Sequence, residues 1–200
     1  MFKGIVCAAL LTIALPSFAA LGDDIRSARV RPHDARTAAL LLQGIERSET
    51  IRGLVSRLEA DSVIVYVEMQ PALHHDLAGR LVWLAATADY RYVRISLNPE
   101  LSSEVLISVL GHELQHALEV ARAPSIVDED SLAAYYKKYG MSMRQHNNGW
   151  DTQAARDAGD LVRREIANSS TRTAAELSQP FTAASWHTVY RDARDRFTSR

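Results

Sequence analysis

The sequence predicts an α+β fold in which a small antiparallel sheet of about three strands packs against one buried helix and further helices. Three observations predict it: helical apolar spacing over residues 34–60, alternating β-branched segments between residues 62 and 97, and a helix over residues 105–120 that is apolar almost all round. The chain of 200 residues is 47% hydrophobic, which is enough for one domain with a sizeable core.

The first 19 residues have the pattern of a cleaved signal peptide. Lys3 supplies a positive charge, residues 4–15 form an apolar segment too short to span a bilayer, and Pro16 ends it. Ser17 and Ala19 place small residues at the −3 and −1 positions of a cut after residue 19. The alternative is an uncleaved N-terminal anchor. We expect a secreted or periplasmic protein without a stable membrane span once the signal is removed.

Charge and cysteine content restrict the partners and ligands. The net charge is −1 and no long block of one sign occurs, so nothing indicates a nucleic-acid partner; the oligomeric state stays open. Cys7 is the only cysteine and lies within the predicted signal peptide. Any metal ion in the mature chain must therefore be bound by histidine, aspartate or glutamate.

The elements before the buried helix follow from local patterns. Residues 34–60 are expected to form two helices, or one kinked helix, because the stretch around residues 46–50 interrupts the apolar stripe. Residues 62–69 read as a strand, and residues 80–87 and 91–97 as a hairpin. The segment 91–97 is interpreted as an edge strand immediately before the buried helix. Residues 21–32 are read as a polar lead-in.

After the buried helix, residues 129–139 are predicted to be helical, with Asp128 as the N-terminal cap and Gly140 at the end. Residues 143–149 are read as a loop and residues 150–167 as a helix with an alanine-rich inward stripe. We expect one domain over residues 20–167. Residues 168–200 are read as a linker and tail that contains a short amphipathic helix at 185–197.

The segment "HELQH" at residues 112–116 carries the clearest chemical signal. Two residues four apart on a helix stack on one face, so the imidazoles of His112 and His116 can bind one tetrahedral cation. Glu113 is offset around the axis and cannot easily bind the same ion, but it can accept a proton from the water bound to that ion. This division of roles is typical of zinc hydrolases. Gly111, directly before the motif, would allow a strand or substrate to approach closely.

This motif after a strand resembles the zincin metalloproteases. Position 119 is not glycine and position 122 is not histidine, unlike the extended metzincin pattern, so the chain is more similar to the gluzincins. It also resembles uncharacterised, exported bacterial HExxH proteins. The resemblance implies a zinc-dependent peptidase that acts on a peptide or protein, with a third ligand from a carboxylate on a later helix.

Two carboxylates are the main candidates for the third ligand. Asp151 begins the helix predicted at residues 150–167 and lies on its inward stripe, where the gluzincin likeness places an acidic ligand. Its alternative role is an N-terminal helix cap. Glu119 shares a face with His112, but it is better placed to hydrogen-bond a ligating histidine. Asp128 and Glu129 are further candidates on ligand chemistry alone.

Other polar residues have weaker signals. One of three tyrosines after the motif could donate to an oxyanion, although packing explains them equally well. His146 could take the same role, His74 and His75 are read as loop residues, and Arg91 and Arg94 could meet a substrate carboxylate or face solvent. The three tyrosines are Tyr135, Tyr136 and Tyr139.

The rival functions are a non-catalytic exported protein with a structural metal and a zinc amidase acting on cell-wall material.

Overall fold

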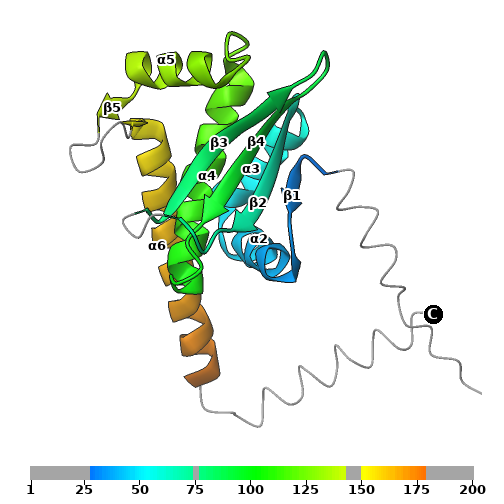
Figure 1. The fold of residues 1–200 in the computed structure, drawn as a ribbon. Helices are drawn as coiled ribbons and strands as arrows, with labels where there is room; N and C mark the ends of the chain where they lie inside the picture. The colour runs from blue at the N-terminus through cyan, green and yellow to red at the C-terminus, as the bar shows by residue number, and fades with distance from the viewer. Residues whose placement is uncertain (1–27, 74–76, 143–149, 179–200) are drawn as a thin grey trace, which may run out of the picture.

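The computed structural model describes residues 28–73, 77–142 and 150–178, with side chains described up to residue 171. The chain forms an α+β fold, as the sequence predicts, with the helices gathered behind a twisted sheet (Figure 1). The predicted signal peptide at residues 1–19 and the predicted amphipathic helix at residues 185–197 lie outside the described residues. Within the described part, no helix is long and apolar enough to cross a membrane.

The main sheet is mixed and has four strands in the order β1-β2-β4-β3. Strands β1 (Val30–Pro32), β2 (Val63–Met69) and β4 (Arg91–Leu97) run parallel, and β3 (Gly79–Ala86) pairs antiparallel with β4. The prediction of a purely antiparallel sheet is therefore wrong, although the β3–β4 hairpin is confirmed. The segment 91–97 is not an edge strand as predicted, because β4 returns between β2 and β3 and leaves β3 at the edge.

Strand β1 lies within residues 21–32, for which the sequence predicts a polar lead-in. It joins the sheet because the chain crosses through two helices and returns as β2, which places the two strands parallel and in register from Val30 opposite Val65. A segment of three residues carries too little alternation to be recognised alone. Its pairing partner lies more than thirty residues later in the chain.

Helices α2 (Ala35–Arg47) and α3 (Glu49–Glu59) are separate, and one serine makes the break between them. Ser48 donates its backbone N–H to Gly44 and ends α2, while its side chain accepts the backbone N–H of Ile51 and begins α3. The interruption predicted around residues 46–50 is confirmed.

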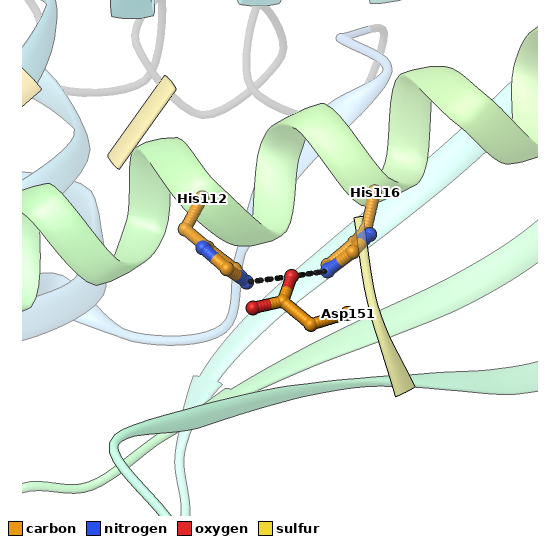
Figure 2. Close-up of side chains that lie close together, drawn as sticks. All are labelled: His112, His116 and Asp151. Atoms are coloured by element: carbon orange, nitrogen blue, oxygen red, sulfur yellow. Dashed lines mark ion pairs between the residues drawn. The ribbon is translucent and has the colours of Figure 1, made fainter. Parts of the chain in front are cut away.

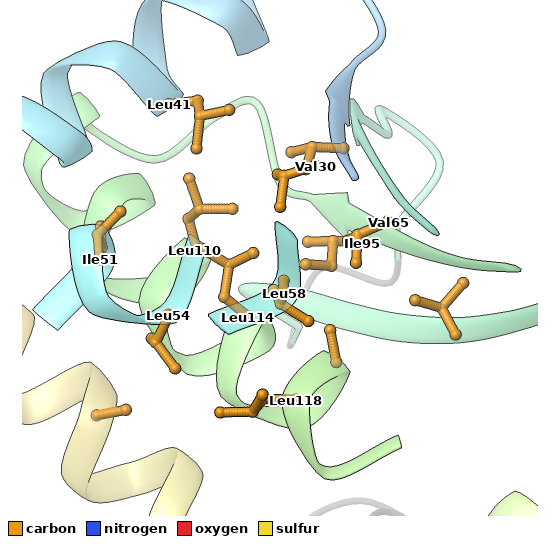
Figure 3. Packing of buried hydrophobic residues seen from close by; sticks show 14 of the residues in the cluster. Val30, Leu41, Ile51, Leu54, Leu58, Val65, Ile95, Leu110, Leu114 and Leu118 are labelled. Atoms are coloured by element: carbon orange, nitrogen blue, oxygen red, sulfur yellow. The ribbon is translucent and has the colours of Figure 1, made fainter. Parts of the chain in front are cut away.

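Helix α4 (Ser103–Arg122) runs through the centre of the molecule, and its apolar residues build the core. Figure 3 shows its leucines between α3 on one side and the inward residues of β2 and β4 on the other. The guanidinium of Arg91 bonds the carbonyls of Val120, Ala121 and Ala123 at the end of the helix, at 2.6–2.9 Å. These bonds add a charged donor to carbonyls at the end of the helix, two of which, those of Val120 and Ala123, also accept a backbone N–H. The core residues labelled in Figure 3 include Leu110, Leu114, Leu118, Ile51, Leu54, Val65 and Ile95.

Helix α6 (Gln153–Ser178) packs along α4 at two glycines, where a side chain would collide with the other helix at Gly111 and meet it in a tight contact at Gly159. A Cβ on Gly111 would lie 2.6 Å from Cγ2 of Val162, and a Cβ on Gly159 would lie 3.2 Å from Cβ of His112. Gly111 thus faces α6, whereas the sequence suggested a strand or substrate there. The helix continues through residues 168–178, where the sequence predicted a linker.

Helix α5 (Glu129–Tyr139) is capped by Asp128 and ends at Gly140, as predicted. Directly after it, β5 (Met141–Ser142) pairs antiparallel with β6 (Trp150–Asp151). A Cβ on Gly140 would lie 2.6 Å from the carbonyl oxygen of Tyr136 and 3.1 Å from that of Asp151. This close approach places the start of α6 beside the end of α5.

Candidate metal centre

Helix α4 presents His112 and His116 on one face, as the spacing of four residues requires. The ring centroids are 4.8 Å apart and the rings stand nearly perpendicular. Figure 2 shows both imidazoles directed toward the side chain of Asp151, which arrives from β6. His116 is buried, and His112 keeps a quarter of its side chain exposed.

One oxygen of Asp151 lies between the two rings. Its Oδ1 is 3.3 Å from Nε2 of His112 and 3.4 Å from Nε2 of His116. Two ligands of a tetrahedral zinc ion, each about 2.0–2.1 Å from the metal, are about 3.3–3.4 Å apart. One ligand atom from each residue lies within 4.8 Å of the others. The two distances from Asp151 Oδ1 match those between ligands of one tetrahedral cation.

The same oxygen is buried and, beyond these two ion pairs, has no hydrogen-bond partner among the described residues. A buried carboxylate oxygen without a donor is costly, and a cation would satisfy it. Burial would raise the pKa of Asp151, but contacts with the two histidines and with Arg156 lower it far below its ordinary value. The carboxylate is therefore ionised and available as a ligand.

Asp151 neither begins the late helix nor caps it, which corrects the sequence interpretation. It lies in β6, where it pairs with Met141, and α6 starts two residues later. Thr152 is the capping residue, because its Oγ1 accepts the backbone N–H of Ala155 at 3.1 Å. Arg156, one turn into the helix, donates Nε to Asp151 Oδ2 at 2.8 Å. That contact leaves Oδ1 as the oxygen that faces the histidines.

Glu119 contacts His116 at the ring nitrogen that faces away from Asp151. Its Oε2 lies 2.9 Å from Nδ1 of His116, on the opposite side of the ring from Asp151. Burial disfavours the imidazolium, but the contacts with Asp151 and Glu119 outweigh it and raise the pKa of His116 to about 10. Of the two main candidates for the third ligand, the structure brings Asp151 to the Nε2 atoms and Glu119 to Nδ1.

Glu113 is buried between α4 and the edge strand β3. Its carboxylate accepts the backbone N–H of Leu81, and a Cβ on Gly79 would lie 3.2 Å from its Oε1. Burial raises the pKa of Glu113, and the nearby histidines oppose that rise. The carboxylate therefore lies against the backbone of β3 and beside the His/Asp group, without belonging to it.

Tyr136 is the tyrosine of the three that contacts the group. Its ring stands edge-on to His116 with centroids 5.2 Å apart, and its buried hydroxyl has no hydrogen-bond partner in the described part of the chain. Burial and the neighbouring carboxylates of Glu119 and Glu113 raise the pKa of Tyr136 well above its ordinary value. The hydroxyl therefore remains a donor. Tyr135 packs against it, and Tyr139 is exposed.

The remaining candidates lie elsewhere. Asp128 caps α5 and Glu129 is exposed beside it, so neither reaches the group. Arg91 caps α4, and Arg94 pairs with Glu68 at 3.3 Å. His74, His75 and His146 lie outside the described residues.

Three contacts at the site were not predicted from the sequence. They are those of the Thr152 hydroxyl with Glu119, of the Arg156 guanidinium with Asp151 and of the Leu81 backbone N–H with Glu113. A threonine three residues before the buried Ala155 is a recognisable capping pattern, so the start of α6 could have been placed at Gln153. The other two contacts join segments far apart in the chain or depend on the direction of a side chain, and no local pattern marks them.

The chain has no significant match to any protein-family model, to any curated protein or to any solved structure.

Proposed function

We propose that the protein is an exported zinc-dependent peptidase in which His112, His116 and Asp151 bind the metal. The observation that carries this proposal is the position of Asp151 Oδ1, which is buried, forms ion pairs with both Nε2 atoms at 3.3–3.4 Å and has no hydrogen-bond partner beyond them among the described residues. The N-terminal pattern of residues 1–19 supports export to the periplasm or the medium. The likeness of residues 112–116 to the gluzincins supports zinc and peptide hydrolysis.

A zinc ion bound there would lower the pKa of a coordinated water and polarise the carbonyl of the substrate. Glu113 is the residue placed to take the proton, because its carboxylate is beside the His/Asp group and is not one of its ligands. A positive charge nearby would also favour its ionised form, which the buried site alone disfavours.

The edge strand β3 supports a peptide as the substrate. Its outer edge has no strand partner among the described residues, and the N–H of Leu81 points from that edge to Glu113. An extended peptide that adds to an exposed edge is held by main-chain hydrogen bonds. Added to β3, it would lie across Glu113 with a carbonyl near the general base.

Tyr136 supplies the remaining role. A tetrahedral intermediate carries negative charge on the former carbonyl oxygen, and a preorganised donor stabilises it. The Tyr136 hydroxyl is a buried donor beside His116 without an acceptor in the described residues. In this proposal it donates to that oxygen.

The test is Glu113→Gln in the mature protein, with zinc content and hydrolysis of a peptide library measured together. The variant keeps the shape of the side chain but cannot accept a proton, so it should bind zinc normally and lose about 10²–10⁴-fold in rate. The exposed Glu129→Gln on α5 is the matched control and should retain both properties.

Undiminished hydrolysis by Glu113→Gln would refute the assigned base, and a wild-type protein that binds no zinc would refute the metal site. Zinc binding without hydrolysis of any substrate would identify a non-catalytic metal protein. Hydrolysis of cell-wall fragments but not of peptides would identify an amidase.

A further inference from the structure

We propose that Thr152 is a positioning residue that acts through Glu119 to set which nitrogen of His116 faces the metal site. This inference rests on the metal site of the proposed function but not on its hydrolytic activity. It assigns a role to a residue that is neither a ligand nor in contact with the histidines' Nε2 atoms.

The hydrogen of the Thr152 hydroxyl has one available destination. Oγ1 accepts the backbone N–H of Ala155 at 3.1 Å, and it lies 2.6 Å from Oε1 of Glu119. The hydroxyl therefore donates its hydrogen to Glu119 while its oxygen accepts from Ala155. Thr152 and Glu119 are 7% and 8% exposed, so water does not readily replace either partner.

The other oxygen of Glu119 then determines the state of the ring. Oε2 lies 2.9 Å from Nδ1 of His116, and because it is an acceptor, Nδ1 must carry the hydrogen. Nε2 is left on the other side of the ring, 3.4 Å from Asp151 Oδ1, where its lone pair can bind a cation. The hydrogen on one ring nitrogen thus decides which nitrogen binds the metal.

Without the Thr152 hydroxyl, Glu119 Oε1 would lose its donor in a buried position. An unsatisfied buried acceptor is unfavourable, so the carboxylate would turn to recover a partner and release Nδ1. Among the described residues, Glu119 is the hydrogen-bond partner of Nδ1. The orientation of His116 therefore depends on Thr152.

The sequence position of Thr152 gives this contact a further consequence. It directly follows Asp151, so one backbone segment at the start of α6 delivers both the third ligand and the support for the second histidine. The two halves of the site, on α4 and before α6, assemble together. Metal affinity should therefore depend on the two linked hydrogen bonds, from Thr152 to Glu119 and between Glu119 and His116, as a unit.

The test compares Thr152→Val, Thr152→Ser and Glu119→Gln in the mature protein, with Zn²⁺ affinity measured by competition with a chelator. Thr152→Val should bind Zn²⁺ about 10–100-fold more weakly, the usual loss for a residue that supports a metal ligand, and Thr152→Ser should restore the affinity. Thr152→Val added to Glu119→Gln should cause little further loss of Zn²⁺ affinity, because both substitutions disrupt the same series of hydrogen bonds.

Valine also removes the cap of α6, and a second cap separates that effect. Asp34 caps α2 far from the site, so Asp34→Ala should lower the melting temperature while leaving Zn²⁺ affinity unchanged. Nitrogen NMR of the histidine rings in the zinc-loaded protein gives a direct readout. The Nδ1–H form of His116 should dominate in the wild type and in Thr152→Ser. In Thr152→Val, the signal of the hydrogen-bonded Nδ1–H should be lost.

Unchanged Zn²⁺ affinity and an unchanged His116 signal in Thr152→Val would overturn the inference while leaving the metal site intact. Fully additive losses in the double variant would also overturn it, since Thr152 would then act only as a cap. A wild-type protein that binds neither Zn²⁺ nor Co²⁺ would instead refute the proposed function.

Discussion

Zinc binding should compete with a proton on His116. In the metal-free protein, Asp151 and Glu119 raise the pKa of this residue to about 10, so the ring is an imidazolium at neutral pH. A metal ion can bind Nε2 only after that proton leaves. Raising the pH above 7 therefore removes a competitor from the site, and zinc affinity should increase.

The pKa sets the size of the effect. Between pH 7 and the pKa of about 10, the apparent zinc affinity should rise about tenfold per pH unit, or about a thousandfold in all. Near pH 8, His116 should release about one proton per zinc bound. Glu119→Gln removes a group that raises this pKa, so in that variant the rise should level off at a lower pH.

Zinc titrations against a chelator from pH 7 to pH 9, corrected for the chelator's own protonation, measure the slope. Calorimetry in two buffers with different protonation enthalpies counts the released protons. A zinc affinity that stays constant over this range would refute the reasoning, because His116 would then be neutral before the metal arrives.

The same pKa predicts how the stability of the metal-free protein varies with pH. The folded-state pKa of His116, about 10, lies above its ordinary value of 6.5, so the protonated ring stabilises the folded state. This stabilisation is fully present below about pH 6.5 and is lost as the pH rises through about 10. The melting temperature of the metal-free protein should therefore fall over that range. Zinc-loaded protein should lack this particular loss, because the ion replaces the proton.

Three further substitutions test other parts of the structure. Asp151→Ala should reduce zinc affinity more than the 10–100-fold typical of a supporting residue, and unchanged zinc stoichiometry would exclude Asp151 as a ligand. Gly111→Ala should destabilise the fold by about 1–3 kcal/mol in urea unfolding because its Cβ would meet Val162, whereas Gly53→Ala, with open space around it, should not; equal effects would contradict the packing of α4 on α6. Arg91→Ala should cost about 1–3 kcal/mol in unfolding free energy and leave KM unchanged, and a raised KM would instead indicate substrate binding.

Much of the local structure could be predicted from the sequence because its causes lie within a few residues. The break at Ser48, the cap at Asp128 and the β3–β4 hairpin each depend on neighbouring side chains and short turns. The pairing of His112 with His116 belongs to the same class, since one turn of helix determines it.

Strand order and the site beyond α4 could not be predicted in this way. The parallel pairing of β1 with β2 and the insertion of β4 between β2 and β3 join segments that no local pattern connects. Without that order, β3 could not be recognised as the edge strand that meets Glu113. The sequence predicts Asp151 as a ligand candidate, but on a helix that begins two residues later in the structure.

The spacing of residues 112–116 is enough to predict two stacked imidazoles and a separate glutamate on α4, because helical periodicity is a local property of the chain. The contacts of Asp151 with their Nε2 atoms, of Glu119 with Nδ1 and of Thr152 with Glu119 follow from the three-dimensional packing. These contacts depend on the packing of α6 along α4 at Gly111 and Gly159 and on the β5–β6 pairing. Such packing arises from the burial of distant residues together, which spacing along the chain does not encode.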